Sequence, residues 1–244
     1  MSLWNKHAIF EKNSIVLTVG ILVVVAIGGL VEILPLFYLK STIETVEGVR
    51  PYTPLELAGR DIYVREGCYL CHSQMIRSLR DEVERYGHYS LAAESKYDHP
   101  FQWGSKRTGP DLARVGGKYS DDWQRGHLSN PRSVVPGSIM PRYAFLAESA
   151  LDYRHIRDSM SVLALEGVPY TPEMIAKADV DIKAQLSPDD PSVTDLVKRY
   201  PKAVAHASLG GDIAVTEQDA LVAYLQMLGA TVDFKLYDNK ANLR

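Results

Sequence analysis

Two thiols and an imidazole lie within five consecutive residues of this chain, in the order Cys68-Tyr69-Leu70-Cys71-His72. One helical turn separates the two sulfurs, so each can form a thioether with one vinyl group along the edge of a porphyrin. His72 then falls beneath the iron, where an imidazole nitrogen can bind it. We therefore predict one covalently bound haem c, attached through Cys68 and Cys71, with His72 as an iron ligand.

Other uses of a cysteine pair remain open at this point. They are a thioredoxin-like redox pair, half of a zinc site and a structural disulfide. A zinc site normally needs a second pair of Cys or His ligands at suitable spacing. The chain has only two cysteines, so the sequence offers no further cysteine for zinc and none for a disulfide framework.

Two downstream turns supply further candidate residues for a haem site. In the turn Gly109-Pro110-Asp111, the carbonyl of Pro110 can accept a hydrogen bond from the free ring N–H of His72. The thioether of Met140, in a Met-Pro loop, can reach the opposite face of the ring and would give a low-spin iron of relatively high potential. The alternative for Met140 is a place in the core. The competing ligands are Met75, His88, His99, His127, His155, His206, Met160, Met174 and Met227.

Length and composition describe an ordinary globular protein. The chain has 244 residues, 46% of them hydrophobic and 23% charged, with a formal net charge of -3. This length is enough for one large domain or two small ones. Nucleic-acid binding is disfavoured, because it requires a clearly basic face.

A long apolar run near the N-terminus predicts a membrane anchor. Residues 15–39 contain one charged residue, Glu32, and would span roughly 37 Å as a helix. A cleaved signal peptide is the alternative, but the run is long and no small-residue cleavage site follows Leu39. Lys6 and Lys12 precede the run and favour a cytoplasmic segment 1–14. The rest of the chain, with its haem, then lies in the periplasm, on the outer side of a bacterial inner membrane.

Glu32 has two interpretations that the sequence leaves open. If the membrane span ends near Val31, the Glu32 carboxylate reaches water at the outer interface. If the helix continues to Leu39, the carboxylate lies inside the apolar zone and faces a partner protein. Gly28 and Gly29, one turn earlier, would let another helix approach closely.

After a linker at residues 40–52, the pattern predicts a mainly α haem domain at residues 53–244. A helix over residues 54–66, capped by Thr53, leads directly into the cysteine motif. Further helices are predicted at residues 121–128 and 216–229. The apolar face of the last helix should pack against the first and close the domain.

Two long insertions interrupt this domain. Residues 73–107 are rich in Arg, Tyr, His and Trp, and a short helix is predicted within residues 75–85. Such a segment covers the haem or docks on a larger partner, because Arg and Tyr are favoured at interfaces. Trp103 and Arg107 are candidates for the haem cover, with Arg107 reaching a propionate. Residues 145–210, with helical patterns at 174–186 and 192–206, carry no catalytic motif.

The order of these motifs resembles a class I cytochrome c. The stretches at residues 67–77, 82–89 and 103–112, together with the N-terminal anchor, resemble the monohaem cytochrome c subunit of a cbb3-type cytochrome c oxidase over nearly the whole chain. The resemblance implies a non-catalytic electron-transfer subunit of a haem–copper terminal oxidase. It implies that electrons come from a dihaem cytochrome c subunit or a soluble cytochrome c. They would pass to the b-type haem of the catalytic subunit.

Two other classes of protein are alternatives. The first is the membrane-anchored cytochrome c subunit of a nitric oxide reductase or another respiratory complex, which differs in its electron acceptor. The second is a peroxidase-like or gas-binding cytochrome with an open iron site. Visible spectra distinguish the second class, because an open site is high-spin and binds carbon monoxide.

Overall fold

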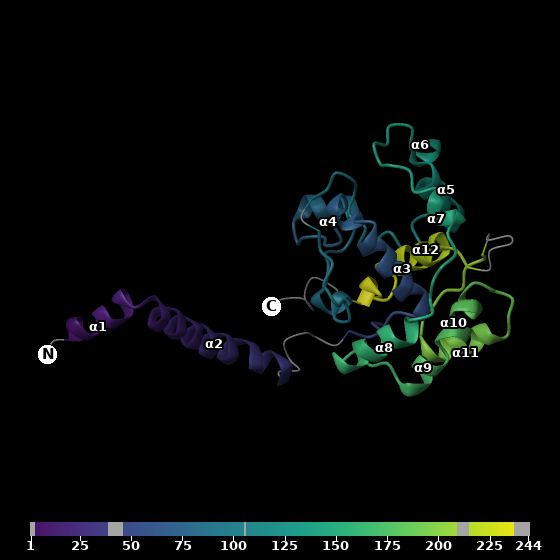
Figure 1. Cartoon of the computed structure of the whole chain (residues 1–244). Coiled ribbons are helices and arrows are strands. Elements are labelled where there is room, and N and C mark those ends of the chain that lie inside the picture. The colour runs from purple at the N-terminus through teal and green to yellow at the C-terminus, as the bar shows by residue number, and fades with distance from the viewer. Residues whose placement is uncertain (1–2, 39–45, 105, 209–214, 237–244) are drawn as a thin grey trace. The chain divides into compact units, whose positions relative to one another are not determined.

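The computed structural model describes residues 3–38, 46–104, 106–208 and 215–236 (Figure 1). This part of the chain is mainly helical and contains no β-sheet, only one isolated antiparallel bridge between Ala150 and Thr216. The first half of the chain contains α1 (Leu3–Lys12), α2 (Ser14–Tyr38), α3 (Pro54–Arg65), η1 (Cys68–Leu70), α4 (Arg80–Tyr86) and η2 (Ala92–Ser95). The second half contains α5 (Asp121–Ser129), α6 (Pro131–Val134), α7 (Phe145–Glu148), α8 (Ile156–Leu165), α9 (Pro172–Ala176), α10 (Ala178–Gln185), α11 (Ser192–Arg199), α12 (Glu217–Met227) and η3 (Phe234–Leu236).

The chain divides into two compact units, residues 1–44 and residues 45–244. In the first unit, α2 is 25 residues long and runs without interruption past Glu32 and Pro35. Its segment Ser14–Pro35 is long and apolar enough to cross a membrane, and none of it is buried within the structure. The predicted anchor therefore forms one continuous helix, although Leu39 and linker residues 40–45 lie outside the described residues.

In the second unit, α3 forms where the sequence predicts a helix, ending one residue earlier at Arg65. Thr53 caps it: the Thr53 side chain accepts from the Glu56 amide at 3.1 Å, and the Glu56 carboxylate accepts from the Thr53 amide at 2.9 Å. Pro54 occupies the first helical position, where its missing N–H costs nothing. The Glu56 carboxylate also forms a buried ion pair with Arg50 at 2.7 Å. These bonds fix the start of the helix that leads to the cysteines.

The predicted contact between α3 and α12 is confirmed (Figure 1). The helices cross at Gly59, where a Cβ atom would lie only 1.9 Å from the carbonyl oxygen of Ala220. Glycine is therefore required at this crossing, because no side chain fits between the two backbones. The rings of Tyr63 and Tyr224 pack beside it with centroids 5.4 Å apart.

The insertion at residues 145–210 contributes to the same hydrophobic core. Met160, Ile182, Leu196 and Tyr200 are fully buried in a cluster that also contains Leu55 of α3. The helices predicted at residues 174–186 and 192–206 are only partly correct. The first is split into α9 and α10, and the second ends at Arg199 as α11.

The helix predicted within residues 75–85 is wrong in its first turn, because α4 begins only at Arg80. The backbone carbonyls that an earlier helix would use are bound elsewhere. The Met75 carbonyl accepts from Nη2 of Arg107 at 3.1 Å, and the Ile76 carbonyl accepts from the Ser90 amide at 2.9 Å. These bonds to residues distant in sequence hold this segment in an irregular path.

Candidate haem site

The cysteine motif forms a tight turn directly after α3. The amides of Cys71 and His72 donate to the carbonyl of Cys68 at 3.2 and 3.0 Å. Both cysteines are free thiols, Cys68 half-buried and Cys71 exposed. Burial raises the pKa of the Cys68 thiol to about 12. Because the two backbone bonds to the Cys68 carbonyl close the turn, both cysteines lie on one turn of chain, as two thioethers to one porphyrin edge require.

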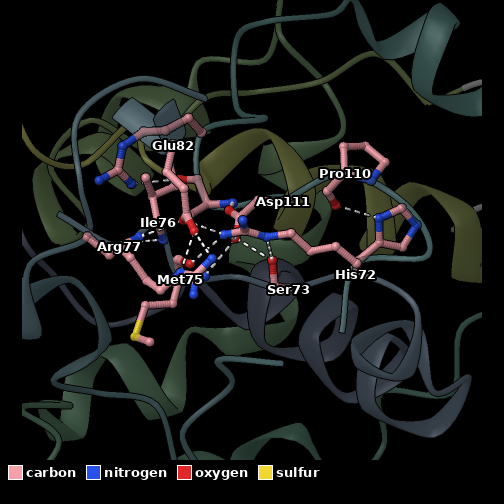
Figure 2. Close-up of polar contacts among 12 residues, drawn as sticks. His72, Ser73, Met75, Ile76, Arg77, Glu82, Pro110 and Asp111 are labelled. Atoms are coloured by element: carbon pink, nitrogen blue, oxygen red, sulfur yellow. Dashed lines mark hydrogen bonds and ion pairs between the residues drawn. The ribbon is translucent and has the colours of Figure 1, made fainter. Parts of the chain in front are cut away.

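The His72 ring is held by the predicted turn at residues 109–111. Its Nδ1 lies 2.8 Å from the carbonyl oxygen of Pro110 (Figure 2). A carbonyl oxygen only accepts, so Nδ1 carries the proton and Nε2 is the nitrogen left to bind a metal. Backbone hydrogen bonds flank this contact on both sides, from the Gly109 amide to Cys71 at 2.9 Å and from the Leu112 amide to Ser73 at 2.9 Å.

Gly109 makes room for the imidazole. A Cβ atom at this position would lie 2.3 Å from Cε1 of His72 and 2.7 Å from Nδ1. The ring of His72 therefore packs flat against the backbone of the turn. The glycine and the proline of this turn act on the same ring, one by leaving space for it and the other by accepting a hydrogen bond from its Nδ1–H.

Large apolar side chains remain exposed around the motif. Leu70, between the two cysteines, is 61% exposed, and Ile139, beside Met140, is 75% exposed. Exposed apolar groups beside the cysteines and beside Met140 are the kind of surface that a flat hydrophobic cofactor covers. No group of three or more His, Cys, Asp or Glu side chains within the described ranges could hold a metal ion, so that part of the chain offers no zinc site.

Residues 7–232 match the protein family described as the mono-heme subunit of cytochrome c oxidase, FixO. The chain belongs to this family. It is a mono-haem electron-transfer subunit of a cbb3-type cytochrome c oxidase and carries one haem c. A comparison with curated proteins gave no match. The match to this family excludes the alternative that the chain is a nitric oxide reductase subunit.

In this FixO-family chain, the Met140 loop lies beside the cysteine motif. Met140 is partly buried and packs against the core. Three residues later, burial and then the Cys68 and Cys71 thiols raise the pKa of Tyr143. Cys68, Met140 and Tyr143 also pack against the same core cluster.

His127 is a second residue that the structure brings to the site. Burial and then the neighbouring His72 imidazole lower the pKa of His127. Its ring stacks on Trp123 with centroids 4.8 Å apart, and its Nδ1 is buried with no hydrogen-bond partner among the described residues. In the sequence His127 is only one of nine competing ligands. The helical spacing of Trp123 and His127 was the one signal that they share a face.

Four of the other competitors can also be placed. Met160 is fully buried in the core, and Met227 and Met174 pack against that core, as Met140 does. His206 pairs with Asp121 at 2.8 Å.

Arg107 was a candidate partner for a haem propionate, and two of its three nitrogens form bonds within the protein. Nη2 of Arg107 lies 2.7 Å from Glu82 and 3.3 Å from Asp111, and Nε donates to Ser73 at 2.6 Å. This cluster could not be predicted from the sequence. Its members come from three separate segments, and nothing in their spacing connects them.

Proposed function

We propose that this subunit receives electrons from a dihaem cytochrome c subunit, or from a soluble cytochrome c, and passes them to the b-type haem of the catalytic haem–copper subunit. The observation that carries the proposal is the His72–Pro110 contact at 2.8 Å in a FixO-family chain, because it presents one imidazole with a fixed tautomer. When bound, the haem supplies an iron that is reduced and oxidised by one electron.

Each site residue has a separate role in this proposal. Cys68 and Cys71 hold the cofactor covalently, so it stays in place through every turnover. His72 would bind the haem iron, and Pro110 would keep the proton on its Nδ1. Met140 would be the second protein ligand. With two protein ligands the site would have no open position for oxygen, so the subunit would transfer electrons and the reaction with oxygen would belong to the catalytic partner.

The topology of the anchor follows from its length and flanking charges. We propose a cytoplasmic segment 1–14, a span 15–39, a linker 40–52 and a periplasmic haem domain 53–244 in a bacterial inner membrane. Lys6 and Lys12 precede the span. Arg50, which follows it, forms a buried pair with Glu56 and is therefore fixed to the haem domain rather than free at the membrane surface. Lipid surrounds the apolar span.

The segment at residues 73–107 is proposed to dock on the catalytic subunit. Arg80 is almost fully exposed and forms a surface pair with Glu84, which contributes little to stability and leaves the guanidinium free for a partner. Trp103 is 53% exposed and contacts Phe101 edge-on. The Trp103 carbonyl accepts from the Gln74 amide at 2.6 Å, so the backbone of Trp103 is held beside a residue that lies two positions after His72. An interface here places the haem edge close to the partner.

The test replaces the exposed Arg80 and Arg85 with alanine, alone and together with Trp103→Ala. Arg77 is left intact, because Glu82, its ion-pair partner, also holds Arg107. Arg154→Ala is the matched control, since Arg154 is an exposed arginine paired with Asp152 in the other insertion. Haem attachment, co-purification with the catalytic subunit and oxygen consumption with reduced cytochrome c are measured.

We expect the variants to keep their haem while the subunit dissociates or electron transfer to the b-type haem slows. Raising the salt concentration should narrow the difference between the variants and the unaltered chain, because salt screens the exposed charges that the unaltered chain still uses. The control should behave as the unaltered chain. If all variants assemble and turn over normally, the segment is a haem cover and the docking proposal is wrong.

A further inference from the structure

Four charged side chains form a neutral cluster behind His72. They are Arg77, Glu82, Arg107 and Asp111, and the side chains of Glu82 and Asp111 are only 3% and 0% exposed. In Figure 2 the His72–Pro110 contact lies at one end of this network and the Arg77–Glu82 contact at the other. The established electron-transfer activity does not by itself require buried charges at this place.

Asp111 joins the two chain segments that carry His72 and Pro110. Its Oδ2 accepts from the Ser73 hydroxyl at 2.5 Å and from the Met75 amide at 3.0 Å, both just after His72. Its Oδ1 accepts from the Ala113 amide at 2.8 Å, within its own turn. Every partner is a donor, so an ionised carboxylate satisfies the site and an amide in its place would turn N–H groups toward other N–H groups.

Arg107 closes the same connection from the other side. Its Nε donates to the Ser73 hydroxyl at 2.6 Å and its Nη2 to the Met75 carbonyl at 3.1 Å. The same Nη2 lies between the carboxylates of Glu82 and Asp111. A buried carboxylate is costly without a partner, so the guanidinium is what allows both to remain charged.

This arrangement bears on the orientation of the imidazole. Backbone bonds hold both sides of the His72–Pro110 contact, from Gly109 to Cys71 and from Leu112 to Ser73, and the charged cluster adds a second, side-chain connection on the Ser73 side. If the Ser73 side were released, the Pro110 carbonyl would move relative to Nδ1. A weaker bond at Nδ1 makes the imidazole a poorer electron donor to iron, which favours the reduced state and raises the potential.

We propose that Asp111 and Arg107 are positioning residues that set the orientation of the His72 imidazole through Ser73 and the Pro110 turn. This inference rests on the proposed ligation of the haem by His72. Glu82 acts one step further away, by holding the Arg107 guanidinium in place. The cluster therefore adjusts the potential and the ligand geometry of the site without touching the cofactor.

The test uses the full-length chain, matured with haem and purified in detergent, with the substitutions Asp111→Asn, Arg107→Gln and Ser73→Ala. The haem-methyl hyperfine shifts of the ferric protein report the plane of the axial imidazole, and a spectroelectrochemical titration gives the midpoint potential. Ser73→Ala leaves every charge in place and is the mildest change, so it answers the question if the other two variants fail to mature. Asp152→Asn, in an exposed pair with Arg154, and Ser161→Ala, at an exposed hydroxyl, are the matched controls.

We expect all three variants to change the methyl-shift pattern and to raise the potential, with the smallest change in Ser73→Ala. The controls should leave both measurements unchanged. A purely electrostatic role predicts a different result: Asp111→Asn raises the potential, Arg107→Gln lowers it, and the methyl pattern is constant. That result, or an unchanged methyl pattern in Ser73→Ala, overturns the inference. Failure of the unaltered chain to bind haem through His72 would instead overturn the proposed function.

Discussion

Gly109 and His72 are in such close contact that a single methyl group at Gly109 would overlap the imidazole, with Cβ 2.3 Å from Cε1. This contact explains a glycine that has no unusual backbone angle to justify it. The His72 ring lies against Gly109, and the carbonyl of the next residue, Pro110, accepts a hydrogen bond from the ring N–H. One short turn thus fixes both the position and the tautomer of the ligand.

Gly109→Ala is therefore expected to displace the His72 ring. The inserted methyl should cost about 1–3 kcal/mol of folding free energy and weaken the bond to Pro110. Haem staining and the ferric absorption spectrum measure the effect, which should appear as less attached haem or a partly high-spin site. Gly126→Ala is the control, because a Cβ there meets only Val134 at 3.7 Å. A Gly109→Ala chain with normal haem content and spectrum would contradict the packing argument.

The Met140 assignment predicts the loss of one absorption band. Met140→Leu should abolish the weak red band of a methionine–iron bond in the ferric protein, raise the high-spin fraction and let the ferrous protein bind carbon monoxide. Met75→Leu is the control, because Met75 is an exposed methionine three residues from His72. Persistence of the band in Met140→Leu would exclude Met140 as ligand.

His127 provides a decisive second variant for the same question. If Met140 is the ligand, His127→Phe keeps the red band, since the phenyl ring can still stack on Trp123. If the unaltered protein has no such band and His127→Phe becomes high-spin, the distal ligand is His127. The spectra of His127→Phe and Met140→Leu therefore distinguish the two candidate ligands.

The parts of this protein that sequence patterns predict are those that depend on neighbouring residues. The turn of Cys68-Tyr69-Leu70-Cys71-His72 and the cap at Thr53 are both local, and both appear in the structure as predicted. The contact of α3 with α12 was predictable because apolar residues recur at helical spacing in both helices, as Leu221, Tyr224 and Leu225 do in α12. The acceptor role of Pro110 depended on the chemical need of an imidazole for a partner, and the geometry at 2.8 Å supports it.

The parts that were missed depend on contacts between distant segments. The start of α4 at Arg80 is set by bonds from the carbonyls of Met75 and Ile76 to Arg107 and Ser90, which no local pattern contains. The sequence pattern made Arg107 a candidate for a propionate and did not predict the two buried carboxylates that the fold pairs with it. Propensity describes a segment alone, and tertiary hydrogen bonds override it.

The anchor is expected to be retained in the mature protein. The apolar helix α2 is 25 residues long, which exceeds the apolar region of an ordinary signal peptide. N-terminal sequencing of the chain purified from membranes should give a start within segment 1–14. A start after about residue 40 would show cleavage and refute the anchor.

The buried carboxylate of Glu82 predicts how stability depends on acid. The hydrogen bond from Arg107, with further bonds from Arg77, lowers the pKa of Glu82 from 4.5 to about 2. Because the folded-state pKa lies below the unfolded one, the stabilisation is complete above about pH 4.5 and is lost as the pH falls toward 2. Glu82→Gln should therefore cost about 1–3 kcal/mol at neutral pH, where Arg107 loses its partner, and progressively less in acid.

Urea unfolding followed by tryptophan fluorescence, repeated from neutral pH into this acid range, measures the difference between the variant and the unaltered chain. Glu84→Gln is the control on the same helix, because Glu84 is exposed and pairs only with the exposed Arg80. Its unfolding free energy should follow that of the unaltered chain at every pH. The two curves for Glu82→Gln and the unaltered chain should converge as the pH approaches about 2, since protonated Glu82 then resembles glutamine. A constant gap between them would show that Glu82 stabilises through packing and not through its charge.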